Sequence, residues 1–261
     1  MQDIKAIDCE YVVEGDGPNL ILIHGIGASY NTWEGVVPLL KDRYRCIRYD
    51  LRGHARSPIP TEPFILDHLV ADLERIYERL NIEHAHVAGH SLGGMIAPMF
   101  AHKHPERVLS MGLLSTAAGR TDEEKTKVIG LVEAMETQGV APLLDQLITR
   151  WFTDGFIEKR PDVVEARRQK VLDTDETIFL NVFRIYAETE MAPVLHKINT
   201  PALVMTGELD GGCNPRINRF IASELPNAQL EILPDLKHAI FLEAPELSAK
   251  HMGAFLDAQT Q

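Results

Sequence analysis

Short apolar runs recur along this chain with amphipathic or loop segments between them, and this alternation restricts the fold more than any other feature. An apolar run of about four to eight residues that ends at a turn is typical of a buried strand. The segment at 65–81 carries its apolar residues at the three-and-four spacing of a helix that packs on a sheet. Strands and helices in alternation predict a parallel α/β sheet. Six runs fit a buried strand, namely NLILIHG (19–25), RCIRYD (45–50), HAHVAG (84–89), LSMGLLS (109–115), PALVMTG (201–207) and QLEILP (229–234).

The N-terminal segment has the pattern of strands and not that of a targeting signal. Residues 4–23 alternate in character around a Gly-Asp-Gly turn at 15–17, which predicts antiparallel edge strands joined by a hairpin. The first eleven residues contain no basic region followed by an apolar run, and no stretch of about 18 apolar residues that could cross a bilayer occurs in the sequence. We therefore expect a cytoplasmic protein.

The alternation breaks between about residue 119 and residue 193, where helical patterns replace the strand-like runs. Thr121 and Glu124 have the spacing of a capping box at the start of the first of these helices. We predict a core formed by residues 1–118 and 194–261, with residues 119–193 as a helical cap over the end of the sheet.

Acidic side chains outnumber basic ones, 38 against 26, which gives a formal net charge of −12. Such a surface repels phosphate backbones and anionic lipid headgroups, so nucleic acids and membranes are poor candidates for partners. The three cysteines, Cys9, Cys46 and Cys213, are odd in number and lack CxxC spacing, which argues against a disulfide framework or a zinc site. No HExxH or similar spacing of metal ligands occurs, so we expect no metal.

The strongest sign of chemistry is Gly89-His90-Ser91-Leu92-Gly93, directly after the strand-like run HAHVA and directly before a helical pattern. A serine at a sharp strand-to-helix turn needs small neighbours, and the strained backbone presents its hydroxyl clear of the sheet. We predict Ser91 as a nucleophile. The Leu92 N–H and the helix N-terminus would lie beside any negative charge that develops during attack.

A serine hydroxyl needs a base that removes its proton and a third group that orients the base. For a nucleophile at this kind of turn the chain order is serine, acid, histidine. The run PALVMTG is followed by Glu208 and Asp210, and we prefer Asp210 because it lies further into the loop, with Glu208 as the alternative. Of the two later histidines, His238 follows a predicted strand, whereas His251 falls within a helical pattern. The predicted triad is therefore Ser91, Asp210 and His238.

A second donor for an oxyanion hole is expected at an earlier junction of strand and loop. The motif His24-Gly25-Ile26-Gly27 follows the run NLILI, and its two glycines would let the backbone approach a substrate closely. We predict the Ile26 N–H as this donor, together with that of Leu92. The side chain of His24 is interpreted as one that fixes the loop by hydrogen bonds.

The motifs HGIGASYNTW, YDLRGHARS, AGHSLGG, MTGELD and KHAIFLEAPE occur in the order and spacing of the α/β-hydrolase family, which the chain resembles over nearly its whole length. The stretch around RWFTDGF is similar to the cap of 3-oxoadipate enol-lactonases and related small esterases. The resemblance implies a cofactor-free hydrolase with a mostly parallel eight-stranded sheet and a helical cap. It also implies roles for the residues that match family motifs. The triad would be Ser91, Asp210 and His238, and the oxyanion donors would be Ile26 and Leu92. The segment that supports the site structurally would be Asp50, Arg52, Gly53 and His54.

Two sets of side chains in or near the cap could shape a substrate pocket. Aromatic residues could line an acyl pocket or pack in the core; our candidates are Trp33, Trp151 and Phe152, followed by Phe156, Phe179 and Phe183. A substrate with carboxylates would need a cation, and the cap arginines could serve or could be solvated surface charges; these are Arg120, Arg150 and Arg184.

The resulting expectation is cleavage of a small-molecule ester or lactone through an acyl-enzyme on Ser91. The same triad would serve hydrolysis of an amide or a carbon–carbon bond, or a receptor that hydrolyses its ligand slowly. A dinucleotide-binding protein is disfavoured, because Tyr30 stands where the third glycine of that motif is required. The sequence indicates neither the physiological substrate nor the oligomeric state.

Overall fold

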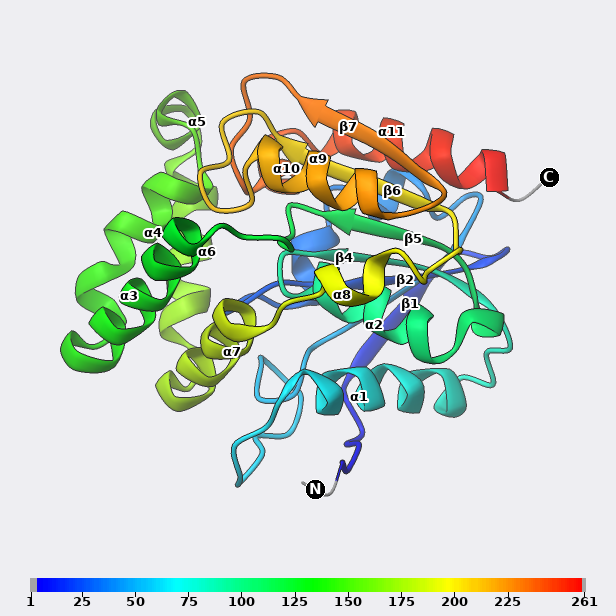
Figure 1. Cartoon of the computed structure of the whole chain (residues 1–261), viewed down its shortest axis with the longest axis horizontal. Coiled ribbons are helices and arrows are strands. Elements are labelled where there is room, and N and C mark those ends of the chain that lie inside the picture. Colours follow the sequence, from blue (N-terminus) through cyan, green and yellow to red (C-terminus); the bar gives the residue numbers. More distant parts are fainter. Residues whose placement is uncertain (1–3, 260–261) are drawn as a thin grey trace.

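The computed structural model describes residues 4–259 and contains, within them, a seven-stranded sheet with helices on both faces (Figure 1). The strand order is β1-β3-β2-β4-β5-β6-β7, and every neighbouring pair except β1 and β3 is parallel. The predicted parallel α/β sheet is therefore confirmed. The strands are β1 (Tyr11–Glu14), β2 (Asn19–Ile23), β3 (Arg45–Tyr49), β4 (Ala85–His90), β5 (Val108–Leu114), β6 (Ala202–Gly207) and β7 (Ala228–Leu233).

Two details of the predicted sheet are wrong. The described residues form seven strands where the resemblance implied eight, and β1 and β2 do not form a hairpin. Instead β1 pairs antiparallel with β3, with Tyr11 opposite Tyr49, and β3 lies between β1 and β2. The glycine turn packs against the backbone just before β3, since a Cβ on Gly15 would lie 2.1 Å from the Lys41 carbonyl oxygen. The turn thus bends around the start of β3 and does not join neighbouring strands.

Successive residues of the buried strands contact opposite faces of the sheet, as the twofold period of a strand requires. Leu20 and Leu22 pack in the apolar cluster on one face, and Ile21 and Ile23 in the cluster on the other. Helices α1 (Leu66–Arg79), α2 (Gly93–Lys103) and α9 (Pro215–Glu224) pack on the isoleucine side. The 3₁₀ helices η1 (Tyr30–Trp33) and η2 (Val37–Leu39) and helix α11 (Pro245–Gln259) pack on the leucine side.

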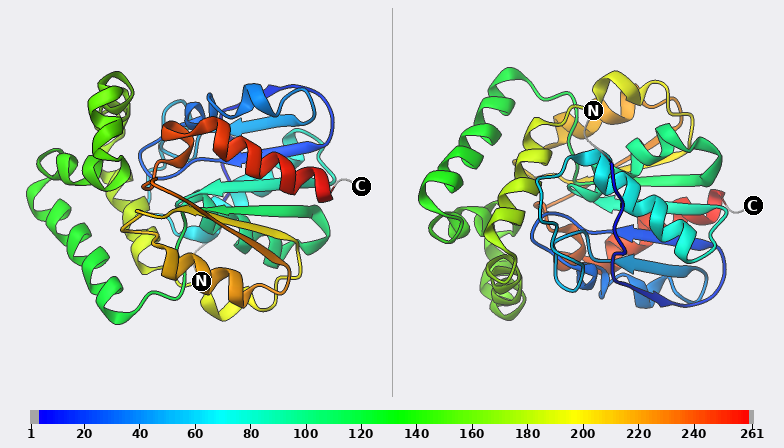
Figure 2. Two further views of the ribbon diagram at one scale, coloured as in Figure 1. Left: turned by 90° about the horizontal axis from the view of Figure 1, so that it is seen from above. Right: turned by 90° about the horizontal axis from the view of Figure 1, so that it is seen from below.

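Residues 119–193, called the helical insertion below, connect β5 to β6 and lie at one end of the sheet (Figure 2). The predicted capping box is present: the Thr121 hydroxyl accepts from the Glu124 N–H (3.2 Å), and the Glu124 carboxylate accepts from the Thr121 N–H (2.8 Å). The separation of core and insertion into two domains stays a prediction. The main helices of the insertion are α3 (Asp122–Gln138), α4 (Leu144–Trp151), α5 (Asp154–Lys159), α6 (Pro161–Leu172) and α7 (Glu176–Glu188).

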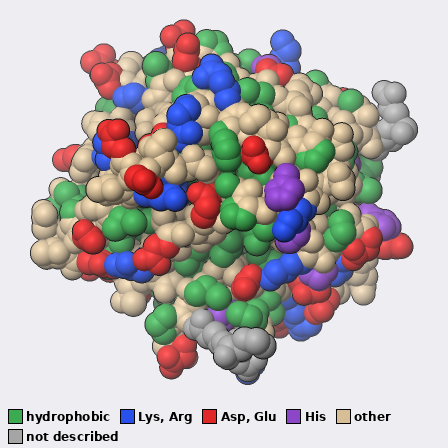
Figure 3. Space-filling view, in the orientation of Figure 1, with side chains coloured by type: hydrophobic (Ala, Val, Ile, Leu, Met, Phe, Trp, Pro, Cys, Tyr) green, Lys and Arg blue, Asp and Glu red, His purple; other side chains and the backbone are tan. Residues whose placement is uncertain are grey.

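Short helices complete the chain: η3 (Pro105–Arg107), η4 (Ala141–Leu143), α8 (Ala192–Leu195) and α10 (Ile240–Glu243). Across residues 4–259, no helix combines the length and the apolar character that a membrane span requires. On the face drawn in Figure 3, Lys and Arg side chains are scattered among Asp and Glu side chains and form no continuous basic patch.

Candidate active site

Ser91 occupies the turn between β4 and α2 in the left-handed backbone region, with φ +56°. Its N–H donates to the Leu114 carbonyl (2.8 Å), and its own carbonyl accepts from the Thr116 hydroxyl (2.8 Å). Leu114 in β5 and Thr116 just after this strand thus hold the strained conformation of Ser91 in place. A Cβ on Gly89 would lie 2.0 Å from the Gly93 carbonyl oxygen, so only glycine allows the strand and the helix to approach this closely.

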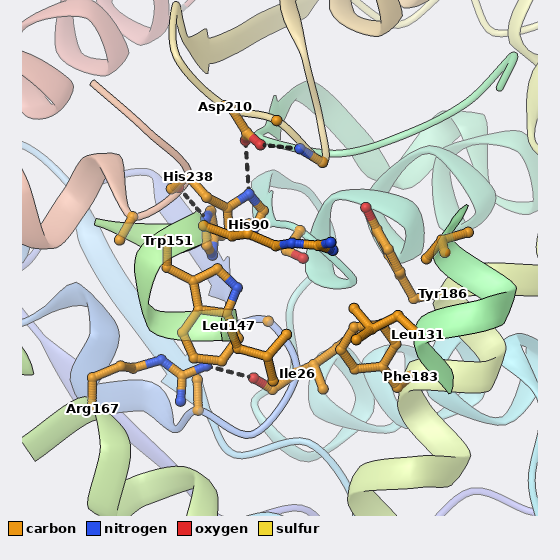
Figure 4. Close-up of a pocket in the computed structure, with 18 of the residues that line it drawn as sticks. Ile26, His90, Leu131, Leu147, Trp151, Arg167, Phe183, Tyr186, Asp210 and His238 are labelled. Atoms are coloured by element: carbon orange, nitrogen blue, oxygen red, sulfur yellow. Dashed lines mark hydrogen bonds and ion pairs between the residues drawn. The ribbon is translucent and has the colours of Figure 1, made fainter. Parts of the chain in front are cut away.

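Asp210 follows β6 and His238 follows β7, and the two side chains meet at the carboxyl ends of these strands (Figure 4). The distance between the Asp210 carboxylate and Nδ1 of His238 is 2.7 Å. The other carboxylate oxygen accepts from the N–H groups of Gly212 (2.9 Å) and Cys213 (2.8 Å). Glu208, the alternative acid, is exposed and makes no contact with His238 in the described structure.

Asp210 and His238 each stabilise the charged form of the other. Burial by itself raises the pKa of Asp210, but the positive charge of His238 and the hydrogen bonds to the carboxylate bring it below its usual value. Burial lowers the pKa of His238, and the Asp210 carboxylate more than reverses this, so that the pKa of the imidazole is raised. His90 adds a further restraint, because its Nε2 donates to the His238 backbone carbonyl (3.0 Å).

Ser91 and His238 open into one cavity of about 260 Å³ between the end of the sheet and the helical insertion. The Ser91 hydroxyl has no hydrogen bond to any residue within 4–259, so its contact with His238 is not formed in this structure. Such bonds are often long in free enzymes and tighten when substrate binds. From the core the cavity is lined by Gly25, Ile26, Ala28, Thr32, His90, Ser91, Asp210, Gly211, Gly212, His238, Ala239, Phe241 and Leu242.

The loop that carries Ile26 lies beside Ser91, because a Cβ on Gly25 would be 3.0 Å from the Cβ of Ser91. The Leu51 N–H donates to Nε2 of His24 (2.9 Å), so the proton of this neutral ring is on Nδ1, which donates to the Gly25 carbonyl (2.7 Å). That carbonyl and the Ile26 N–H belong to the same peptide group. His24 therefore restrains the peptide group that carries the Ile26 N–H.

Neither predicted oxyanion donor, the N–H of Ile26 or that of Leu92, has a hydrogen-bond partner within the part of the chain that the structure describes. Ile26 lines the cavity, and Leu92 directly follows Ser91, which lines it too, although Leu92 itself is fully buried. Buried N–H groups without a partner are uncommon in folded proteins and call for an explanation. A developing oxyanion would supply that partner.

The segment around His54 supports the same loop. Nε2 of His54 accepts from the Gly27 N–H (3.1 Å), and Nδ1 donates to the Arg52 carbonyl (3.1 Å). Burial lowers the pKa of His24 to about 4 and that of His54 to about 3, so both rings are neutral at pH 7. The Arg52 guanidinium forms a buried ion pair with Asp72 (2.6 Å). These contacts agree with the supporting role that the family resemblance implied for the segment.

The three aromatic residues predicted for the pocket differ in their relation to the cavity. Trp151 lines the cavity, but Trp33 and Phe152 do not. Trp33 is fully buried on the leucine side of the sheet, with its ring 4.3 Å from that of Phe241. Phe152 follows Trp151 by one residue, so it points elsewhere and stacks on Phe156 (5.5 Å).

The predicted cations also differ in position. Arg120 and Arg150 line the cavity, whereas Arg184 pairs with surface glutamates of the insertion. Sequence reasoning missed Arg167 and Lys127, because a helical pattern does not indicate which neighbour its polar face meets. The full lining from the insertion is Arg120, Glu124, Lys127, Val128, Leu131, Leu147, Arg150, Trp151, Arg167, Phe183 and Tyr186.

One group of side chains has the composition of a metal site, which sequence spacing did not indicate. Potential ligand atoms of Asp210, Cys213 and His238 lie within 4.8 Å of one another. Asp210 and His238 already form a hydrogen bond, and the Cys213 thiol contacts the Tyr186 hydroxyl (3.1 Å). Each of the three side chains therefore has a partner within the described part of the protein.

Comparison with known proteins assigns the fold. Residues 18–153, more than half of the chain, match the α/β-hydrolase fold family, so the chain belongs to that family. It is 28% identical to 3-oxoadipate enol-lactonase 2 of Acinetobacter baylyi over 89% of this chain and 86% of that protein. It is 28% identical to pimeloyl-[acyl-carrier protein] methyl ester esterase of Aeromonas hydrophila over 89% of this chain and 92% of the relative. The solved enol-lactonase of Burkholderia xenovorans LB400 superposes with a TM-score of 0.88 and 26% identity over 95% of this chain and 96% of the other. These relatives support a hydrolase.

Proposed function

We propose that this protein is a serine hydrolase that cleaves an ester or lactone of a small molecule through an acyl-enzyme on Ser91. The main support is the cavity that Ser91 shares with the hydrogen-bonded Asp210 and His238. His238 takes the serine proton as the hydroxyl attacks the carbonyl carbon, and Asp210 stabilises the imidazolium. The N–H groups of Ile26 and Leu92 bind the oxyanion. His238 then protonates the leaving oxygen and activates the water that releases the acid.

The charges around the cavity support a substrate that carries a carboxylate. Arg120, Arg150 and Arg167 line the cavity, and within residues 4–259 none of them has a carboxylate partner at ion-pair distance. The two carboxylates of the lining, Glu124 and Asp210, already have partners in Arg216 and His238. An acidic protein thus has a locally cationic cavity, which attracts anions.

Arg120 is the best placed of these cations to bind a substrate carboxylate. It is 7% exposed, and its Nη1 donates to the Tyr186 carbonyl (3.0 Å). Its Nη2 has no hydrogen-bond partner among the described residues. Leaving a buried charged donor unpaired is costly, and a carboxylate would satisfy it. Two relatives bear names that specify an enol-lactone and a methyl ester, which supports the proposed type of bond.

The proposal is tested with a serine-directed fluorophosphonate and a panel of p-nitrophenyl esters and small lactones. We expect labelling at Ser91, mapped by mass spectrometry, with matching loss of turnover. Replacing Ser91 by Ala should lower kcat by about 10⁴-fold or more with little change in melting temperature. A Ser91→Ala variant that retains most of its activity would contradict the proposal. Labelling without turnover of any ester or lactone would favour amide or carbon–carbon hydrolysis, or a receptor.

A further inference from the structure

Arg167 connects the helical insertion to the loop that carries Ile26. It lies in α6, and its guanidinium donates from Nη2 to the Ile26 carbonyl (2.9 Å; Figure 4). It also donates from Nη1 to the Gly27 carbonyl (2.5 Å). The other hydrogen bonds that hold this loop come from the core, through His24 and His54. Among the described residues, Arg167 is the one side chain of the insertion that forms hydrogen bonds with the peptide groups of residues 25–27.

Trp151 extends this connection to the opposite side of the cavity. The guanidinium of Arg167 lies 4.3 Å from the centroid of the Trp151 ring, a distance at which a cation–π interaction is favourable. The Trp151 carbonyl in turn accepts from the Ala239 N–H (2.9 Å), the residue directly after His238. The pair formed by Arg167 and Trp151 thus contacts both the Ile26 loop and the loop of the predicted base.

The chemistry of Arg167 suits a positioning role. Burial lowers its pKa to about 10, so the side chain stays protonated at pH 7. Within residues 4–259 its partners are carbonyl oxygens and an aromatic ring, and no carboxylate pairs with it. A planar guanidinium can donate to two neighbouring carbonyls while its face covers the indole, which an ammonium group cannot do.

We propose that Arg167 is a positioning residue that orients the Ile26 N–H for the oxyanion, so that the oxyanion hole is complete only when the insertion is seated on this loop. The proposal rests on the proposed function. Two observations carry it: the bidentate contact to the carbonyls of residues 26 and 27, and the absence of any hydrogen-bond partner for the Ile26 N–H among the described residues. A substrate anion bound directly by Arg167 is the competing explanation.

The test compares Arg167→Met and Arg167→Lys with a matched control, Arg168→Met. Arg168 is the next residue of α6, but it pairs with Asp145 of the insertion (2.6 Å) and has no contact with the Ile26 loop. Each variant is assayed with a neutral p-nitrophenyl ester and with one that carries a carboxylate, and its melting temperature is recorded. The inhibition constant of a neutral alkyl trifluoromethyl ketone, whose adduct with a serine places an oxyanion in the hole, is compared with that of the parent alcohol.

For Arg167→Met we expect kcat to fall about tenfold to a hundredfold, while KM for the neutral ester changes less than about threefold. Binding of the ketone should weaken by a similar factor, and binding of the alcohol should not. Arg167→Lys keeps the charge, so its kcat and its affinity for the ketone should lie between those of Arg167→Met and those of the wild type. This variant serves as the test if Arg167→Met does not fold. Arg168→Met should stay within about twofold of the wild type.

Three results would overturn the inference: unchanged kcat and ketone binding in both Arg167 variants, a loss confined to substrates that carry a carboxylate, or an equal loss in Arg168→Met. The wild-type protein separates this failure from failure of the proposed function. If the fluorophosphonate does not label Ser91 in the wild type, the serine mechanism fails and the inference fails with it. Normal labelling with unaffected Arg167 variants overturns the inference alone.

Discussion

Asp210 sets the protonation of His238, and removing its charge should therefore change the pH dependence of activity. In the proposed mechanism only the neutral imidazole accepts the serine proton, so kcat/KM should rise with pH through the pKa of His238. In Asp210→Asn the carboxylate that raises this pKa is gone, while the burial that lowers it remains. We expect kcat to fall by about 10³- to 10⁴-fold and the rise of the profile to move to lower pH. Because the Asp210 carboxylate raises the pKa of His238 to about 10 in the wild type, a pH–rate series from about pH 4.5 to about pH 11 checks this, and an unmoved midpoint would contradict it.

Arg120 is expected to act on binding and not on the chemical step. Arg120→Met should raise KM about tenfold to a hundredfold for esters that carry a carboxylate, because a hydrogen bond to a charged group is lost. KM for neutral esters should change little. Arg184→Met, which removes two surface ion pairs of the same insertion, is the matched control. Equal losses for charged and neutral esters would exclude carboxylate binding at Arg120.

For residues with strong local signals the position in the fold could be predicted from the sequence, whereas for residues whose place depends on tertiary packing it could not. Ser91, Asp210 and His238 each follow a recognisable strand, and parallel strands bring their carboxyl ends to one edge of the sheet. Trp33 gave no comparable signal, since the sheet face on which it packs depends on the path of η1. Arg167 was missed for the same reason: its contact with Ile26 spans 141 residues of chain.

At Gly89, where β4 approaches α2, there is no space for a side chain. Gly89→Ala places a Cβ 2.0 Å from a backbone oxygen, which neither element can avoid without moving. We expect the free energy of unfolding to fall by about 3 kcal/mol or more, measured by urea denaturation.

The matched control is Gly130→Ala in the interior of α3, where no described atom beyond the neighbouring backbone of the helix lies within 4 Å of the new Cβ. That variant should be more stable by about 0.5–1 kcal/mol, because alanine favours helix over glycine. Similar effects at both glycines would contradict the steric explanation.

The secondary-structure elements could be predicted better than the way in which they pair and pack with one another. The core strands and the helical character of 119–193 follow from periodicity, and the α/β-hydrolase fold is confirmed. The pairing of β1 with β3 was not predictable from the glycine turn, because turn residues fix a local bend and not the strand that lies beside it. The orientation of the insertion helices likewise depends on contacts distant in sequence.

Protonation of buried histidines should make the whole molecule acid-sensitive. Burial lowers the pKa of His24, His54, His86 and His90 to between about 3 and about 4, whereas an unfolded histidine titrates near 6.5. Between these values the unfolded chain binds more protons than the folded one, so stability is lost as pH falls below about 6.5.

The expected fall in the free energy of unfolding between pH 7.5 and pH 5 is several kcal/mol, at about 1.4 kcal/mol for each pKa unit and each histidine as an upper bound. Urea titrations at several pH values measure it. His102→Gln should leave the slope unchanged, because His102 lies on the exposed surface of α2. A wild-type stability that does not vary over this range would contradict the prediction.

The link from Trp151 to Ala239 has a consequence for the evolution of new specificities. Enzymes on one fold diversify when the segment that selects substrates can mutate freely while the chemical machinery stays constant. Here α4 supplies both lining side chains and a backbone hydrogen bond to the residue after His238. The backbone bond survives a substitution at position 151, but the Trp151 ring also lies against the Arg167 guanidinium. A library that randomises the insertion is therefore expected to disturb the proposed positioning of the Ile26 loop unless positions 151 and 167 are held constant. The path to a new substrate is expected to run first through cavity positions such as Leu131, Leu147 and Phe183, which lack that link.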